Sequence, residues 1–172
     1  MVNSRNKGAS FERQIAAQLF GLTGVTFKRD LEQYRAADHG DLLPDDQDWP
    51  FVIECKKYAT GTGCKPAWRA QATAAANATG RFPAVVYKFD RRDTWVSVPV
   101  SAIAAAFDGQ SNCDQWAEIT LEGLAYLAAE IMAQTNSDKG RGESPRDRSS
   151  RRALVAATPR QIGEATSQGA KL

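Results

Sequence analysis

The chain has 172 residues, 42% of them hydrophobic, and a formal net charge of +2, which is an ordinary composition for a globular protein. Its length fits a single domain with its own core, and no apolar run approaches the ~18 residues that cross a membrane. The polar start, Met1 to Ser10, does not resemble a signal peptide, so a membrane protein is not expected.

The three cysteines, Cys55, Cys64 and Cys113, lack the spacing of a metal site, and their odd number favours a reducing cytoplasm. His39 is the single histidine and is expected in a loop close to Asp41, so a His-based zinc site, a His-metal nuclease or a Ser/His/Asp site is not expected. The segment Gly61 to Gly63 lacks the lysine and serine of a phosphate-binding loop, so no nucleotide cofactor is expected.

Charge is unevenly distributed along the chain. Residues 136–172 hold eight Lys or Arg and four Asp or Glu, a local charge of +4, which leaves 14 basic and 16 acidic residues and a charge of −2 in residues 1–135. The sequence therefore predicts a folded domain over 1–135 and a disordered polar and basic tail over 136–172.

The first predicted element is a helix from about Ser10 to Leu22, ended by Gly21 and Gly24, with apolar residues at helical spacing and Glu12 at the edge of that stripe. Short strands are expected at Val25 to Lys28 and at Asp41 to Leu43. After a turn at 45–48, the segment Pro50 to Lys57 predicts a further strand.

The second half continues with a helix from about Pro66 to Thr79, because proline favours the first helical turn and Gly80 favours a stop. An apolar strand follows at Phe82 to Phe89, and a charged turn joins it to a strand at Thr94 to Val98. Helices are expected over 100–107 and from about Thr120 to Gln134. The order of elements predicts an α/β domain with a small mixed sheet.

The strand at Pro50 to Lys57 carries the most informative residues. Side chains alternate between the faces of a strand, so Glu54 and Lys56 share a face that is otherwise apolar at Val52. Burying such a charge is costly unless it is paired or binds a metal. With Asp41, these residues fit a magnesium-dependent site that cuts phosphodiester bonds.

In this order, four segments resemble the PD-(D/E)XK phosphodiesterase superfamily, and within it the Holliday-junction-resolvase-type nucleases of archaea and bacterial viruses. They are Asn6 to Glu12 at the first helix, Gly40-Asp41, Glu54-Cys55-Lys56, and Trp68 to Gln71. The resemblance covers roughly residues 5–100 and implies a restriction-endonuclease-like core. One departure is Gly40, which stands where the superfamily's name implies proline.

The resemblance implies a role for each matching residue. Asp41, Glu54, the Cys55 carbonyl and Glu12 would hold Mg²⁺, with Mn²⁺ as a substitute, and Lys56 would orient or activate the attacking water. The implied DNA contacts come from a further set: Arg5, Lys7, Gln71 and Arg69.

Plainer interpretations remain open for these residues. Asp41 is also compatible with a surface loop, Glu54 with a salt bridge to Lys56, and Glu12 with a helix-dipole carboxylate. Gln71 is compatible with an ordinary helix surface, Arg5 and Lys7 with a frayed terminus, and Trp68 is expected to pack rather than to stack on a base.

The function implied by the resemblance is a metal-dependent DNA endonuclease that leaves a 5′-phosphate, acts on branched DNA as a homodimer, and works in the cytoplasm of a bacterial or phage-infected cell. Two alternatives stay open. One is an exonuclease or a nicking or restriction-type enzyme on linear duplex, and the other is a catalytically inactive DNA-binding module.

Overall fold

A computed structural model describes residues 4–30, 40–107, 109–111 and 113–140. One six-stranded sheet lies at its centre, with the strands in chain order from β1 to β6. The strands are β1 (Phe27–Arg29), β2 (Leu42–Pro44), β3 (Phe51–Tyr58), β4 (Phe82–Phe89), β5 (Thr94–Pro99) and β6 (Trp116–Ile119). Strands β3 and β4 are parallel and the other neighbours are antiparallel, so the sheet is mixed, as predicted.

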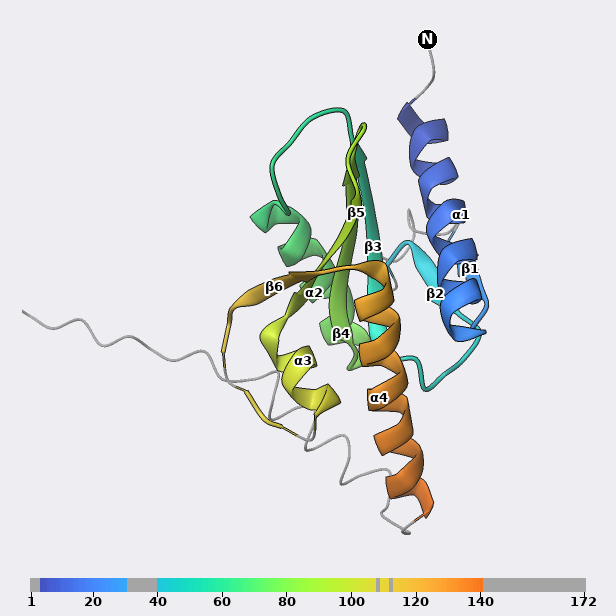
Figure 1. Ribbon diagram of the computed structural model, residues 1–172, viewed down its shortest axis with the longest axis vertical. Coiled ribbons are helices and arrows are strands. Elements are labelled where there is room, and N and C mark those ends of the chain that lie inside the picture. The colour runs from blue at the N-terminus through green and yellow to red at the C-terminus, as the bar shows by residue number, and fades with distance from the viewer. Residues whose placement is uncertain (1–3, 31–39, 108, 112, 141–172) are drawn as a thin grey trace, which may run out of the picture.

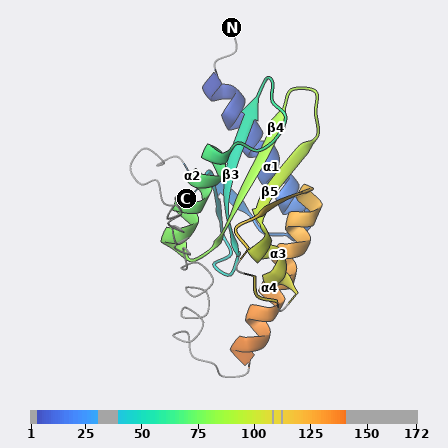
Figure 2. The same cartoon turned by 90° about the vertical axis from the view of Figure 1, so that its left-hand side faces the viewer.

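Four helices flank the sheet: α1 (Ser4–Thr23), α2 (Pro66–Thr79), α3 (Val100–Ala106) and α4 (Leu121–Gly140). Helix α2 covers one face of the sheet, while α1, α3 and α4 lie on the other (Figures 1 and 2). The parallel pairing of β3 with β4 requires a crossover connection, and α2 supplies it. The predicted α/β class, with a small mixed sheet flanked by helices, is confirmed.

Alternation along the strands divides the core between the two faces. Ile53, Val86 and Val96 point toward α1 and α4, where Phe11, Ile15 and Leu124 are among the side chains that they join. The intervening residues of the same strands face α2, and Val85, Tyr87 and Phe89 pack there against Trp68. The main core therefore lies under α1 and α4, and a smaller core lies under α2.

Two predicted helices differ from the structure at one end. Helix α1 begins at Ser4 rather than Ser10, and α4 continues past Gln134 to Gly140. Thr135 and Ser137 donate hydrogen bonds to the carbonyls of Ile131 and Ala133 one turn back, so polar side chains are accommodated in this last part of α4. Residues 136–140, predicted as tail, are thus helical, while 141–172 lie outside the described residues.

Other boundaries agree more closely. Helix α2 and strand β4 have the bounds that the sequence predicts, and Gly80 ends α2 with a left-handed φ of 65°. The sequence did not predict β6, which has only four residues and pairs with β5. Within the described residues, no helix is long and apolar enough to span a membrane.

Candidate active site

Asp41 is held against strand β3 by the residue that precedes it. Gly40 has a φ of 74°, and a Cβ there would lie 2.7 Å from the Ile53 carbonyl oxygen and 2.8 Å from Val52 Cγ1. This close approach lets the Asp41 amide donate to the Ile53 oxygen at 2.8 Å, and Asp41 Oδ2 accepts from the Cys55 amide at 2.5 Å. The Asp41 side chain is thereby fixed, largely buried, at the edge of β3.

Glu54, Lys56 and Gln71 form a hydrogen-bonded group on the α2 side of β3. Lys56 Nζ donates to Glu54 Oε1 at 2.6 Å and to Gln71 Oε1 at 3.0 Å. Gln71 Nε2 also donates to Glu54 Oε1, at 2.7 Å. The predicted shared face of Glu54 and Lys56 is confirmed, and α2 brings Gln71 to both of them.

The electrostatics of this group are dominated by two neighbouring carboxylates. Burial and the neighbouring Asp41 carboxylate raise the pKa of Glu54, and Lys56 acts in the opposite direction; the net result is a pKa of about 7. Burial lowers the pKa of Lys56, but the hydrogen bond and charge of Glu54 outweigh it, so the pKa of this ammonium is raised. At neutral pH Lys56 is therefore a cation facing an excess of negative charge.

Cys55 contributes its backbone rather than its sulfur. Burial raises the pKa of the thiol, and the nearby carboxylates of Asp41, Glu12 and Glu54 raise it further, so the thiol stays protonated at neutral pH. In a strand, the amide and carbonyl of one residue point to the same edge. Because the Cys55 amide donates to Asp41, its carbonyl oxygen also faces the edge where Asp41 lies.

Glu12 approaches the same region from helix α1, but it has a partner of its own. Arg29 of β1 donates a hydrogen bond from Nε to Glu12 Oε2 and forms an ion pair with it. The Glu12 carboxylate also raises the pKa of the Cys55 thiol, which packs on the face of β3 opposite Glu54 and Lys56. Arg29 was not among the predicted residues, and no local pattern links it to Glu12, 17 positions away.

The donor groups at this edge fit a divalent cation with few protein ligands. Among the described residues, no group of three or more His, Cys, Asp or Glu side chains is arranged to hold a metal ion. Mg²⁺ usually keeps several waters and binds through one or two carboxylates. Asp41, Glu54 and the Cys55 carbonyl supply such oxygens. Asp41, Glu54 and Lys56 together carry a formal charge of −1, which a hard cation would offset.

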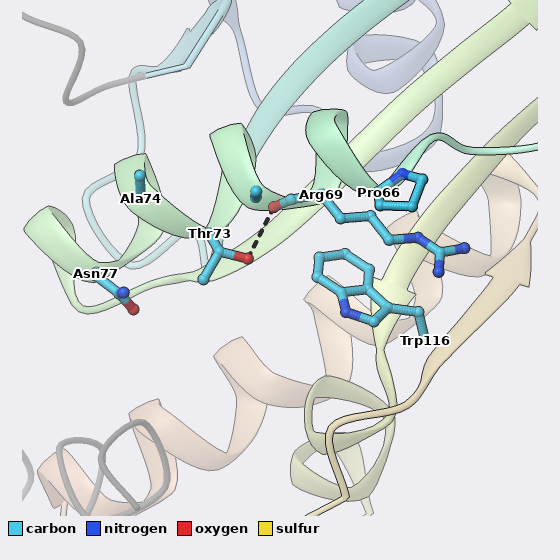
Figure 3. Close-up of a pocket in the computed structure, with 7 residues that line it drawn as sticks. Pro66, Arg69, Thr73, Ala74, Asn77 and Trp116 are labelled. Atoms are coloured by element: carbon cyan, nitrogen blue, oxygen red, sulfur yellow. Dashed lines mark hydrogen bonds between the residues drawn. The ribbon is translucent and has the colours of Figure 1, made fainter. Parts of the chain in front are cut away.

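The four predicted DNA contacts lie in different places. Gln71 is at the carboxylate site, and Lys7 is exposed on α1, whereas the side chain of Arg5 lies outside the described part of the structure. Arg69 lies away from the carboxylate site and contacts residues of β5 and β6. Its Nε donates to Ser97 Oγ at 3.1 Å, and its guanidinium lies 5.4 Å from the centre of the Trp116 ring (Figure 3).

The sequence contained a signal that separates Arg69 from Gln71. Residues two positions apart in a helix differ by about 200° around its axis, at ~100° per residue. Only one of the two can therefore face the strand that carries Glu54. Trp68 is buried beside Tyr87 and Phe89, which confirms its predicted packing role.

Comparisons with known proteins identify a family for this chain. The family described as "Phage putative PDDEXK endonuclease" matches residues 3–134, a span that includes Asp41, Glu54 and Lys56. No curated protein matches the chain. Among solved structures, Hjc of Archaeoglobus fulgidus, a Holliday junction resolvase from an archaeal hyperthermophile, is similar at 17% identity and a TM-score of 0.46, covering 71% of this chain and 98% of that one. Because the family match extends over most of the chain, the protein belongs to this family of PD-(D/E)XK endonucleases.

Proposed function

We propose that the protein is a Mg²⁺-dependent endodeoxyribonuclease that hydrolyses phosphodiester bonds, with branched DNA as its substrate. The observation that carries the proposal is the group formed by Asp41, Glu54, Lys56 and Gln71, in which two buried carboxylates face one ammonium and one amide. PD-(D/E)XK nucleases generally use divalent metals, and the oxygens at this edge are of the kind that Mg²⁺ prefers.

Asp41, Glu54 and the Cys55 carbonyl would hold the cation, and Glu12 would complete the site directly or through water. When bound, the cation supplies positive charge that polarises the attacking water and stabilises charge developing on the phosphate. Glu12 takes part only if its ion pair with Arg29 opens or if a water bridges the gap. Mn²⁺, which has similar preferences for oxygen ligands, would substitute for Mg²⁺.

Lys56 acts as a fixed cation in this proposal. Its raised pKa keeps it protonated, so it orients the water through hydrogen bonds and offsets charge on the reacting phosphate rather than accepting a proton. Gln71 positions Lys56 and Glu54 relative to each other, because it accepts from the first and donates to the second. The resemblance to the superfamily further implies that cleavage leaves a 5′-phosphate.

The sequence resemblance to junction-resolving nucleases favours branched DNA over linear duplex. A four-way junction has two symmetry-related strands to cut, and a homodimer would supply two active sites about a twofold axis. Phe107, directly after α3, and Tyr126 on α4 are exposed and have ring centres 6.4 Å apart, and they offer apolar surface for such an interface. Arg5, Lys7 and Arg69 remain candidate contacts to the DNA backbone.

The test is cleavage of a synthetic four-way junction beside a linear duplex of the same sequence, in Mg²⁺ and in EDTA. Paired symmetric nicks on the junction alone, abolished by EDTA and by Asp41→Asn, are expected. Mg²⁺-dependent cutting of both DNAs would retain the nuclease and refute junction specificity. Binding without cutting of either DNA, unchanged in Asp41→Asn, would instead favour a catalytically inactive DNA-binding module.

A further inference from the structure

An exposed aromatic side chain lies directly beyond Lys56 on strand β3. Tyr58 follows Lys56 by two positions, so it points to the same face of the strand, about 7 Å further along at ~3.3 Å per residue. The Tyr58 side chain is 45% exposed, unlike Val52 and Glu54 earlier on this face. It is the last residue of β3, beside the loop that leads into α2.

Tyr58 contacts one aromatic ring and one ammonium among the described residues. Its ring stacks on the buried Trp68 ring, with centres 5.0 Å apart and planes inclined by 20°. Lys65 Nζ lies 5.1 Å from the centre of the Tyr58 ring and 5.3 Å from that of Trp68. Beside these two contacts Tyr58 keeps 45% of its surface exposed, so part of its ring remains accessible to a ligand.

The backbone around this cluster is closely packed. The Tyr58 carbonyl accepts from the Asp90 amide at 3.0 Å, and a Cβ at Gly61 would lie 2.0 Å from Phe89 Cε1. The loop is therefore pressed against the buried Phe89 ring with no room for a side chain at position 61. Tyr58 and Lys65 are presented from a well-supported surface, as a preformed binding site requires.

We propose that Tyr58 and Lys65 form a binding platform for the nucleotide next to the scissile phosphate. The outer face of Tyr58 stacks on an unpaired base, and the Lys65 ammonium contacts a backbone phosphate. This inference rests on the proposed function, because it assumes that the cleaved strand passes over Lys56. The platform continues the face that carries Glu54 and Lys56, and its exposed cation complements a phosphate backbone.

The platform favours one kind of DNA. Within a duplex, each base has neighbours stacked on both faces, so an exposed ring cannot stack on it without unstacking the helix. An unpaired base has a free face, and stacking on aromatic side chains tolerates any base sequence. Tyr58 should therefore favour DNA with unpaired nucleotides at the bound position, whereas Lys65 should contribute to paired and unpaired DNA alike.

The experiment measures dissociation constants in EDTA by fluorescence anisotropy, with the full chain and two DNAs of one sequence. One DNA is fully paired and the other carries a short central bulge of unpaired nucleotides. Tyr58→Leu keeps apolar contact with Trp68 but removes the ring, and Tyr58→Phe keeps the ring. Phe20→Leu on α1 is the matched control for an exposed aromatic residue, at 54% exposure. Lys88→Gln, on the opposite face of the sheet, is the control for Lys65→Gln.

We expect Tyr58→Leu to weaken binding of the bulged DNA about 10-fold and to change binding of the duplex less than about twofold, in line with the energies of base stacking on aromatic rings. Tyr58→Phe should bind like the wild type. Lys65→Gln should weaken binding to both DNAs. It should also reduce the magnitude of the slope of log affinity against log salt concentration by about one, as expected for the loss of one phosphate contact. Phe20→Leu and Lys88→Gln should leave the binding of both DNAs and its salt dependence unchanged.

Equal losses on both DNAs in Tyr58→Leu, or the same loss in Phe20→Leu, would overturn the platform. So would wild-type protein that fails to prefer the bulged DNA. Circular dichroism and thermal melting of each variant identify any loss that comes from unfolding. A partly unfolded sample weakens binding of both DNAs by the same factor, so the ratio of the two dissociation constants for Tyr58→Leu decides the question. Failure of the proposed function is seen separately, as wild-type protein that binds these DNAs but does not cut a four-way junction in Mg²⁺.

Discussion

The pKa of Glu54 predicts how the stability of the metal-free protein depends on pH. The carboxyl has a pKa of about 7 in the folded chain, against an ordinary value of 4.5, so between these values the folded state binds more protons than the unfolded state. The free energy of unfolding therefore decreases as pH rises through this range. The difference corresponds to about 3 kcal/mol, at ~1.4 kcal/mol per pKa unit.

Glu54→Gln removes this titration while keeping the shape of the side chain. Its amide oxygen can still accept hydrogen bonds from Lys56 and Gln71, and the repulsion between Glu54 and Asp41 is lost. Urea unfolding in EDTA at several pH values from 5 to 8 should show the wild type losing stability relative to Glu54→Gln. The value of about 3 kcal/mol is an upper limit, because a scan from pH 5 begins above the ordinary pKa of 4.5 and so covers only part of the titration.

Glu122→Gln is the matched control. This carboxylate is exposed in the first turn of α4, and its pKa is lowered by its own backbone amide and by Thr120, so it does not titrate between pH 5 and 8. The free energy of unfolding of this variant should depend on pH as that of the wild type does. If the free energies of unfolding of the wild type and Glu54→Gln changed equally with pH, the argument that burial and Asp41 raise the pKa of Glu54 would be refuted.

The same samples test the metal site at pH 8. A cation that binds only the folded state stabilises it by about 2.7 kcal/mol at a concentration 100 times its dissociation constant. Mg²⁺ should therefore raise the unfolding free energy of the wild type and have a much smaller effect on Glu54→Gln. An equal effect on both proteins would show that Mg²⁺ acts elsewhere.

Three further predictions concern the same region and the tail. Lys56→Met should reduce cleavage by about 100-fold or more without weakening DNA binding by a similar factor, because a charge beside the reacting phosphate acts on the transition state; single-turnover cleavage and anisotropy measure the two effects, and equal losses would contradict this role. Gly40→Ala should lower the free energy of unfolding by about 2 kcal/mol or more, because alanine must adopt a φ of 74° and its Cβ meets the Ile53 oxygen. Urea unfolding measures this loss, and unchanged stability would disprove the close approach. Deleting residues 141–172, which hold seven Lys or Arg and three Asp or Glu, should make DNA binding less dependent on salt, and an unchanged slope would rule out a contribution from the tail.

The elements with clear local signals were predictable. Helix α2 has proline at its first turn and glycine after its end, and β4 is a continuous apolar run, so both were assigned with their observed bounds. Strand β6 has only four residues and no long apolar run, so its local pattern is weak. It exists because β5 offers a free edge for pairing, which is a property of the assembled sheet.

Alternation along β3 determined that Glu54 and Lys56 share a face, and the order of motifs determined the nuclease family, because both depend only on positions along one chain. The contacts of Asp41 with Cys55, of Gln71 with Glu54 and of Glu12 with Arg29 join residues 14 to 17 positions apart. Those contacts depend on how α2 crosses between β3 and β4 and how Gly40 approaches β3. The sequence by itself thus determined the chemical groups and the strand that presents them, while only tertiary packing decided which groups meet, how deeply they are buried and what their pKa values become.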